Sequence, residues 1–163
     1  MSATPMAPTK RYFRPGVTKI LWSPGAGSIA DYNSPTRVEI DACVDVSAEV
    51  AEIEGFQVTS NNLDTPDFGS RFNSKIPSDI VADDSALNTY ADSTSVDVRS
   101  VLQRGQDGYV IFMDEGDTAG LLMDVFPTRV AATPKLRSRS DPAMIRAQFT
   151  VTREPAENVT IPA

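Results

Sequence analysis

Residues 109–126 read YVIFMDEGDTAGLLMDVF, two apolar runs separated by an acidic loop. The runs at 109–113 and 121–126 each have a length that is typical of β-strands. The segment between them contains two glycines, the residue type that tight turns most often need. This stretch therefore predicts two strands joined by a hairpin loop.

Similar runs recur along the chain on both sides of this hairpin. Residues 147–152 alternate small or apolar side chains with polar ones, and we expect them to pair with the hairpin. Short strands at close intervals with turn signals between them favour a mainly β, antiparallel sandwich or small barrel over a parallel sheet. The other expected strands are 11–13, 17–22, 50–58, 68–76, 86–91 and 145–152, with the second hairpin strand extending over 121–130.

Two short helices are expected between the strands. A Ser-Pro pair at 34–35 is typical of a helix start, and the helix would run through 37–41. Residues 94–97 form a capping-box pattern, the apolar residues of 98–102 share one helical face, and Gly105 stands where a C-terminal cap belongs. Both helices are expected to be structural connectors.

The length of 163 residues fits one domain with terminal extensions. Residues 1–10 hold two prolines and two threonines without periodicity, which predicts a flexible N-terminal arm. We expect the β-sandwich domain over 11–152 and a C-terminal arm over 153–163. Within the domain, 60–84 is a long polar segment rich in turn residues, and such segments are usually functional or ordered by a partner. It is therefore interpreted as a long interaction loop.

A glycine motif at 25–30, GAGSIA, matches the G-x-G-x-x-A pattern of a dinucleotide-binding turn. That turn must lie between a strand and a crossover helix whose free N–H groups point at the pyrophosphate. Residues 17–22 supply a strand, but Pro24 interrupts the turn and Pro35 follows too soon for the helix. A plain loop is favoured, and no cofactor is expected.

Composition excludes several classes of function. The formal net charge of −7 argues against tight binding to nucleic acid or an anionic membrane, since both require clustered cations. The absence of histidine removes Ser-His-Asp and Cys-His catalysis and most zinc sites. Cys43 has no second cysteine to pair with, and no secretory signal or membrane anchor is expected, so synthesis in a reducing cytosol is favoured. No catalytic, cofactor-binding or metal-binding residue is predicted.

Two charged clusters could serve as contact surfaces. The acidic loop with Asp114, Glu115 and Asp117 lacks the spacing of an EF-hand, and the basic run 135–139 has too few charges for nucleic-acid binding. Solvated loops are the simplest interpretation of both. The alternative hypothesis is that the acidic tip and the basic loop meet across subunits of an assembly.

Seven segments together resemble one family, the tail tube (major tail) proteins of long-tailed, non-contractile bacteriophages. The resemblance runs from about residue 10 to the end, with the segments in the same order, and it rests on order and coverage because no single segment is a strong motif. The segments are RYFRPGVTK (11–19), SPTRVEID (34–41), VAEIEGFQV (50–58), DFGSRF (67–72), DVRSVLQRG (97–105), DVFP (124–127) and TREPAE (152–157).

The resemblance implies a structural protein without enzymatic activity, located in the virion tail and assembled in the host bacterial cytoplasm. Its subunits would form hexameric rings that stack into a tube through which viral DNA passes without specific binding. The implied partners are further copies of the chain and the tail tip or baseplate, tape measure and tail terminator proteins. The hypothesised inter-subunit and inter-ring contacts are Phe68, Arg71, Phe72, Lys75, Ile76, Asp114, Glu115, Asp117, Lys135, Arg137, Arg139, Arg153 and Glu154.

Three other functions remain open at this point. A β-sandwich that binds carbohydrate on a virion or cell surface would need an aromatic platform, for which the chain offers one tryptophan and four tyrosines. An enzyme that works with two carboxylates is possible in principle because the chain has 22 Asp and Glu residues, although no pair stands out. Another phage tail component is the third alternative.

Overall fold

The computed structural model describes residues 3–163, which contain eleven strands and two short helices. The helices are α1 (Arg37–Asp41) and a 3₁₀ turn, η1 (Val98–Ser100). The strands are β1 (Lys19–Pro24), β2 (Val44–Asp45), β3 (Val50–Glu54), β4 (Val58–Thr65), β5 (Ser74–Ala82), β6 (Ser85–Tyr90), β7 (Asp107–Met113), β8 (Leu122–Ala132), β9 (Lys135–Leu136), β10 (Met144–Val151) and β11 (Ala156–Thr160).

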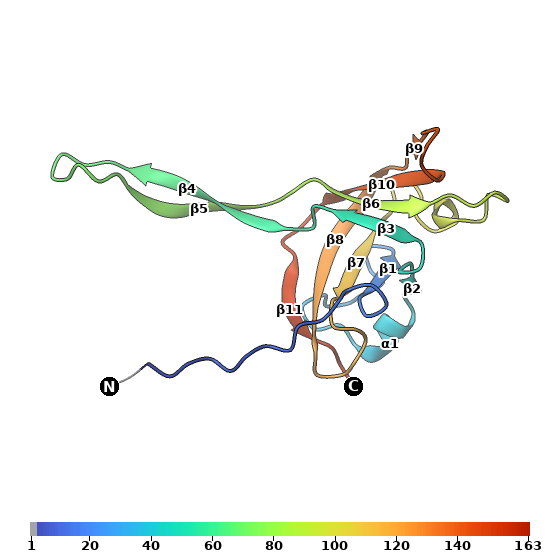
Figure 1. The fold of residues 1–163 in the computed structure, drawn as a ribbon, viewed down its shortest axis with the longest axis horizontal. Helices are drawn as coiled ribbons and strands as arrows, with labels where there is room; N and C mark the ends of the chain where they lie inside the picture. Colours follow the sequence, from blue (N-terminus) through green and yellow to red (C-terminus); the bar gives the residue numbers. More distant parts are fainter. Residues whose placement is uncertain (1–2) are drawn as a thin grey trace.

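Nine of the strands form one curved sheet, and β4 and β5 form a hairpin that projects from it (Figure 1). The order in the sheet is β2-β1-β7-β8-β10-β6-β3, with β11 also pairing with β8 and β9 with β10. Every pairing is antiparallel. The predicted mainly β, antiparallel class with short helices is therefore confirmed.

The hairpin predicted from 109–126 is the centre of the sheet. In it β7 and β8 pair with Val110 opposite Phe126, and β10 pairs with the other edge of β8 with Phe149 opposite Val130, as the alternation of 147–152 predicted. Side chains of β7 alternate between two apolar clusters, one on each face of the sheet. Burial on both faces explains why YVIFM is a continuous apolar run instead of an alternating one.

The larger of the two apolar clusters has an aromatic centre. Phe56 packs edge-on against Phe112 and Phe126 with ring centroids 4.9 and 5.4 Å apart, and Trp22 lies 5.8 Å from Phe149. The smaller cluster on the opposite face joins residues of β7 and β8 to α1, the loop after β1 and the C-terminal segment. These packing layers hold together strands that are distant in sequence.

The first helix begins two residues later than the Ser-Pro pair at 34–35 predicts. Thr36 is the N-cap, and Thr36 and Glu39 bond each other's backbone N–H groups in a capping box. Glu39 also accepts a hydrogen bond from the backbone N–H of Ala30 at 2.8 Å, and these hydrogen bonds lower the pKa of Glu39. The carboxylate of Glu39 therefore holds both the loop after β1 and the start of α1.

The second predicted helix is shorter than its pattern suggests. Asp97, not Thr94, caps the 3₁₀ turn, and its carboxylate binds the backbone N–H and the guanidinium of Arg99. Val98 and Leu102 are buried as the apolar face predicts, and Gly105 adopts a positive φ of 83°. Local side-chain hydrogen bonding by Asp97 starts the turn at Val98, three residues later than the capping-box pattern predicts.

One predicted strand is absent, and two others differ in extent from the prediction. Residues 11–13 are not a strand, since 3–18 are irregular and contain neither helix nor strand. Residues 68–73 lie in the turn of the β4–β5 hairpin, and β5 begins only at residue 74. The run 50–58 is broken at Gly55, whose φ of 69° and closeness to the backbone of Asp84 leave no room for a Cβ.

The glycine motif at 25–30 is a loop after β1, as its sequence context favours. Tyr109 donates a hydrogen bond from its hydroxyl to the carbonyl oxygen of Ala26 at 2.8 Å, which ties the loop to β7. At the C-terminus, the segment expected as an arm contains β11, which pairs with β8, and a buried Ile161. Across residues 3–163, no helix has the length and apolar character needed to cross a membrane.

Candidate functional site

The hairpin of β4 and β5 is the most prominent feature of the surface (Figure 1). Its strands pair from Val58 opposite Ala82 at the root to Thr65 opposite Ser74 near the tip, with one irregularity in the register. The apolar side chains that it exposes are Leu63, Phe68, Phe72, Ile76, Ile80 and Val81. A two-stranded hairpin cannot bury such side chains by itself, so they are available for contact with another molecule.

The segment 60–84 predicted as an interaction loop thus consists largely of this hairpin. Five of the hypothesised contact residues lie on it and are exposed: Phe68, Arg71, Phe72, Lys75 and Ile76. Of these, Lys75 forms an ion pair with Asp64 across the two strands, with Nζ 3.3 Å from the carboxylate. The sequence pattern places these residues in one surface element but does not reveal that the element is paired β structure.

The two charged clusters lie at opposite ends of the sheet. The acidic loop immediately precedes β8 and the basic loop immediately follows it, and the eleven residues of β8 separate them. At the usual rise per residue, this strand spans roughly 35 Å. Figure 1 shows the two loops at the bottom and the top of the domain, so they do not meet within one copy.

The acidic loop is partly neutralised within its own chain. Asp114 forms an ion pair with Arg14 at 2.9 Å, and Asp117 forms one with Arg37 at 2.6 Å. The hydrogen bonds from Arg37 lower the pKa of Asp117, whereas partial burial raises the pKa of Asp114. Glu115 accepts a long hydrogen bond of 3.4 Å from the hydroxyl of Tyr12.

The basic loop is more open than the acidic one. Lys135 lies in β9, which pairs with β10, and Arg137 and Arg139 follow in an exposed irregular segment. None of these three side chains forms an ion pair with any residue of 3–163. Their charges are therefore free to interact with another molecule.

Arg153 and Glu154 occupy different environments although they are neighbours. The Arg153 guanidinium lies 4.9 Å from the ring centroid of Tyr32 and donates a hydrogen bond to the Tyr109 hydroxyl at 2.9 Å. These contacts lock the loop after β1 onto β7, a structural role that no local sequence signal reveals. Glu154 is exposed.

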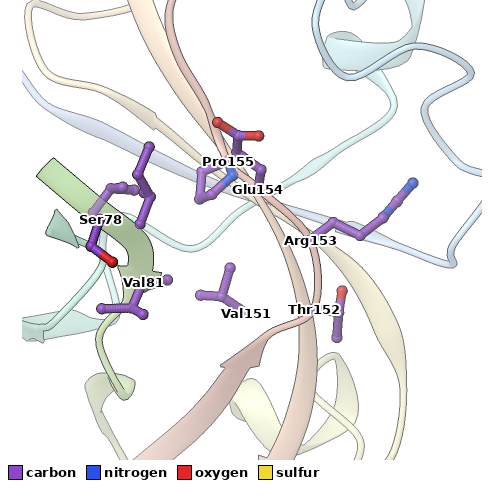
Figure 2. A pocket seen from close by; sticks show the side chains of 10 residues that line it. Ser78, Val81, Val151, Thr152, Arg153, Glu154 and Pro155 are labelled. Carbon is purple, nitrogen blue, oxygen red and sulfur yellow. The ribbon is translucent and has the colours of Figure 1, made fainter. Parts of the chain in front are cut away.

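A groove lies between the root of the hairpin and the segment that joins β10 to β11 (Figure 2). Figure 2 shows Ser78 and Val81 of β5 facing Val151 and Pro155, while Arg153 points away from the hairpin. The groove has a volume of about 450 Å³. We call it the root groove, and its lining residues are Val58, Ser78, Ile80, Val81, Ala82, Val151, Thr152, Arg153, Glu154 and Pro155.

Residues 3–163 contain no cluster of three or more Cys, Asp or Glu side chains that could hold a metal ion. Cys43 is half-buried, and that burial raises the pKa of its thiol, which disfavours the reactive thiolate.

The chain was compared with solved structures, curated proteins and protein-family models. Among solved structures, the chain resembles a chain of the anti-feeding prophage (AFP) baseplate, with 10% identity, a TM-score of 0.59, and coverage of 92% of this chain and 95% of that one. It also matches Hcp protein at 9% identity (TM-score 0.43, 83% of this chain, 88% of that chain). The Dit protein of SPP1 matches at 13% identity (TM-score 0.41, 83% of this chain, 50% of that chain). A search of curated proteins finds no match.

The likeness to the AFP baseplate chain shows a shared fold at low sequence identity. The decisive match is to a family model described as "Phage tail tube protein", which covers residues 6–163. Since this match spans nearly the whole described chain, the chain belongs to the phage tail tube protein family and is a structural component of the phage tail, not an enzyme.

Proposed function

We propose that six copies of this chain form a ring around a central lumen and that the rings stack head to tail into a tube. The chain belongs to the tail tube family. The observation that carries the proposal is that its domain has an acidic loop at one end of β8 and a basic loop at the other. A contact between two different surfaces of the same chain is heterologous, and repetition of such a contact produces rings or open stacks.

Charge supports the stacking of rings. The free cations of the basic loop, Arg137 and Arg139, lie at one end of the domain, and the loop that holds Glu115 lies at the other. When one ring meets the next, the basic end of one copy comes to face the acidic end of another. This extends the sequence-based hypothesis that the acidic tip and the basic loop meet between subunits, and the pairing would favour one orientation of stacking.

Open sheet edges support lateral contacts within a ring. Strand β3 is the last strand of the sheet and pairs only with β6 within residues 3–163. An unpaired edge is a hazard for a monomer but becomes useful when a neighbouring copy completes the sheet. The AFP baseplate structure, which shares the fold, is 6-fold symmetrised, and this agrees with the proposed number of copies.

The net charge suits a conduit for viral DNA. Six copies at −7 each carry a formal charge of −42 per ring. Affinity for DNA grows with the number of phosphates that a protein neutralises, so an acidic or neutral lumen lets DNA slide without adhering. In this role the tube is made in the host bacterial cytoplasm and meets the tail tip or baseplate, tape measure and tail terminator proteins.

Electron microscopy of the purified protein tests the proposal, with size-exclusion chromatography beside it. Over a series of rising concentrations, we expect rings or hollow tubes, and tail-tip extract should lower the concentration at which they form. A protein that stays monomeric at all concentrations, even with the extract present, would contradict the proposed assembly.

A further inference from the structure

We propose that the tip of the β4–β5 hairpin of one copy docks into the root groove of a neighbouring copy of the chain. The tip is defined as residues 66–73, which join the two strands. The inference rests on the proposed function, because it names the surfaces through which copies of the chain contact each other. It assigns both partners of the contact to residues of this chain.

The tip exposes the kinds of side chain that often bind in a pocket of another protein. Phe68 and Phe72 are exposed, so two aromatic rings stand in solvent within five residues of each other. Burial of aromatic side chains dominates the energetics of many interfaces. Arg71 lies between them and forms no ion pair with any residue of 3–163.

The root groove has matching chemistry. Val58, Ile80, Val151 and Pro155 give it an apolar lining, and its volume of about 450 Å³ lies in the range of pockets that accommodate small ligands or side chains. Glu154 also lines the groove and has no ion-pair partner within residues 3–163. An apolar pocket with a free carboxylate is complementary to a pair of aromatic rings with a free guanidinium.

The geometry requires a second copy. The tip and the root groove lie at opposite ends of the same hairpin, and the eight residues of β4 place them roughly 25 Å apart. Because the paired strands are extended, the tip of one copy cannot fold back into its own groove. Every copy therefore presents one tip and one groove, and the contact propagates from copy to copy with a spacing set by the hairpin length.

Charge exchange between Arg71 and Glu154 tests this contact. We expect the single variants Arg71→Glu and Glu154→Arg each to raise the minimum concentration for tube formation by about tenfold, as like charges would then meet in the groove. The double variant, which restores opposite charges, should return it to within about threefold of the unmodified protein. Arg104→Glu, which reverses an exposed charge elsewhere, is the matched control. Single variants that assemble like this control, or a double variant without rescue, would overturn the inference.

Cysteine cross-linking separates this inference from the proposed tube. In a Cys43→Ser background, a chain with both Arg71→Cys and Glu154→Cys should form a ladder of disulfide-linked multimers on oxidation, whereas each single-cysteine variant should not exceed a dimer. A ladder without tubes would support the docking contact and contradict the tube. Tubes without a ladder would support the proposed function and overturn the docking contact.

Discussion

Arg37 and Asp117, eighty residues apart in sequence, form a bidentate ion pair with N–O distances of 2.6 and 2.7 Å. The Nε of Arg37 also donates a hydrogen bond to Asp41 at 2.8 Å. One guanidinium thus fixes helix α1 to the loop between β7 and β8. This contact at the acidic end of the domain cannot be predicted from the local sequence.

Removal of this contact should destabilise the domain moderately. We expect Asp117→Asn to lower Tm by a few degrees, because the forked pair becomes a weaker neutral contact and both partners are partly exposed. Differential scanning calorimetry measures the change, with Arg104→Ala as an exposed control that should leave Tm unaltered. Equal effects of the two substitutions would show that the ion pair contributes nothing to stability.

Asp97 should make part of the free energy of unfolding depend on pH. Hydrogen bonds from Arg99 lower the pKa of Asp97 to about 2, and its side chain is nearly fully buried. A group whose pKa is lower in the folded than in the unfolded state stabilises the fold above its unfolded pKa, near 4 for an aspartate. This stabilisation is lost as pH falls from about 4 to about 2.

The substitution Asp97→Asn isolates this contribution. The free energy of unfolding, measured in urea at several pH values, should be lower for the variant than for the unmodified protein at pH 7. The difference should shrink as pH falls through the same range, since the aspartate is then protonated in both states. Asp141→Asn, at an exposed loop position, is the control. A difference that stays constant with pH would refute the role assigned to the carboxylate.

Gly55 is where the chain leaves the sheet for the hairpin. Its φ of 69° favours glycine, and a Cβ there would overlap the backbone of Asp84 and Ser85. We expect Gly55→Ala to reduce the free energy of unfolding by about 3 kcal/mol. Gly27→Ala, which meets nothing within 4 Å, should have little effect in the same urea titration. A tolerated Gly55→Ala would mean that the junction can take another conformation.

The basic loop should matter for assembly and not for folding. Reversal of Arg137 and Arg139 to Glu should leave Tm almost unchanged, because neither side chain forms an ion pair within residues 3–163. It should raise the concentration needed for tube formation several-fold at low ionic strength and have a smaller effect in high salt, where charges are screened. Sedimentation of tubes at two salt concentrations measures both effects. Unchanged assembly would remove the proposed pairing of acidic and basic ends.

The sheet can be predicted from sequence wherever burial leaves a strong local pattern. YVIFM at 109–113 is apolar throughout because both of its faces are covered, and its pattern alone indicates a strand. Strands β4 and β5 cannot be predicted over their full length, because a solvated hairpin has no buried face and its residues resemble turn formers. Strand β9, with two residues, carries no detectable period.

Contacts between distant segments are beyond the reach of sequence patterns. Nothing near Arg153 predicts that it packs on Tyr32 and bonds Tyr109. The same holds for the root groove, whose walls come from residues 58–82 and 151–155. By contrast, the exposed Phe68 and Phe72 can be placed in an interaction segment, because aromatic residues among turn formers have no core to join.

Electron cryomicroscopy of the assembled protein tests the central claim most directly. End-on views should show six-fold rings with an open lumen, and side views should show rings stacked with one polarity, the basic end of each copy facing the acidic end of a copy in the next ring. Closed particles of another symmetry, or rings that stack in both orientations, would contradict the proposal of a head-to-tail tube.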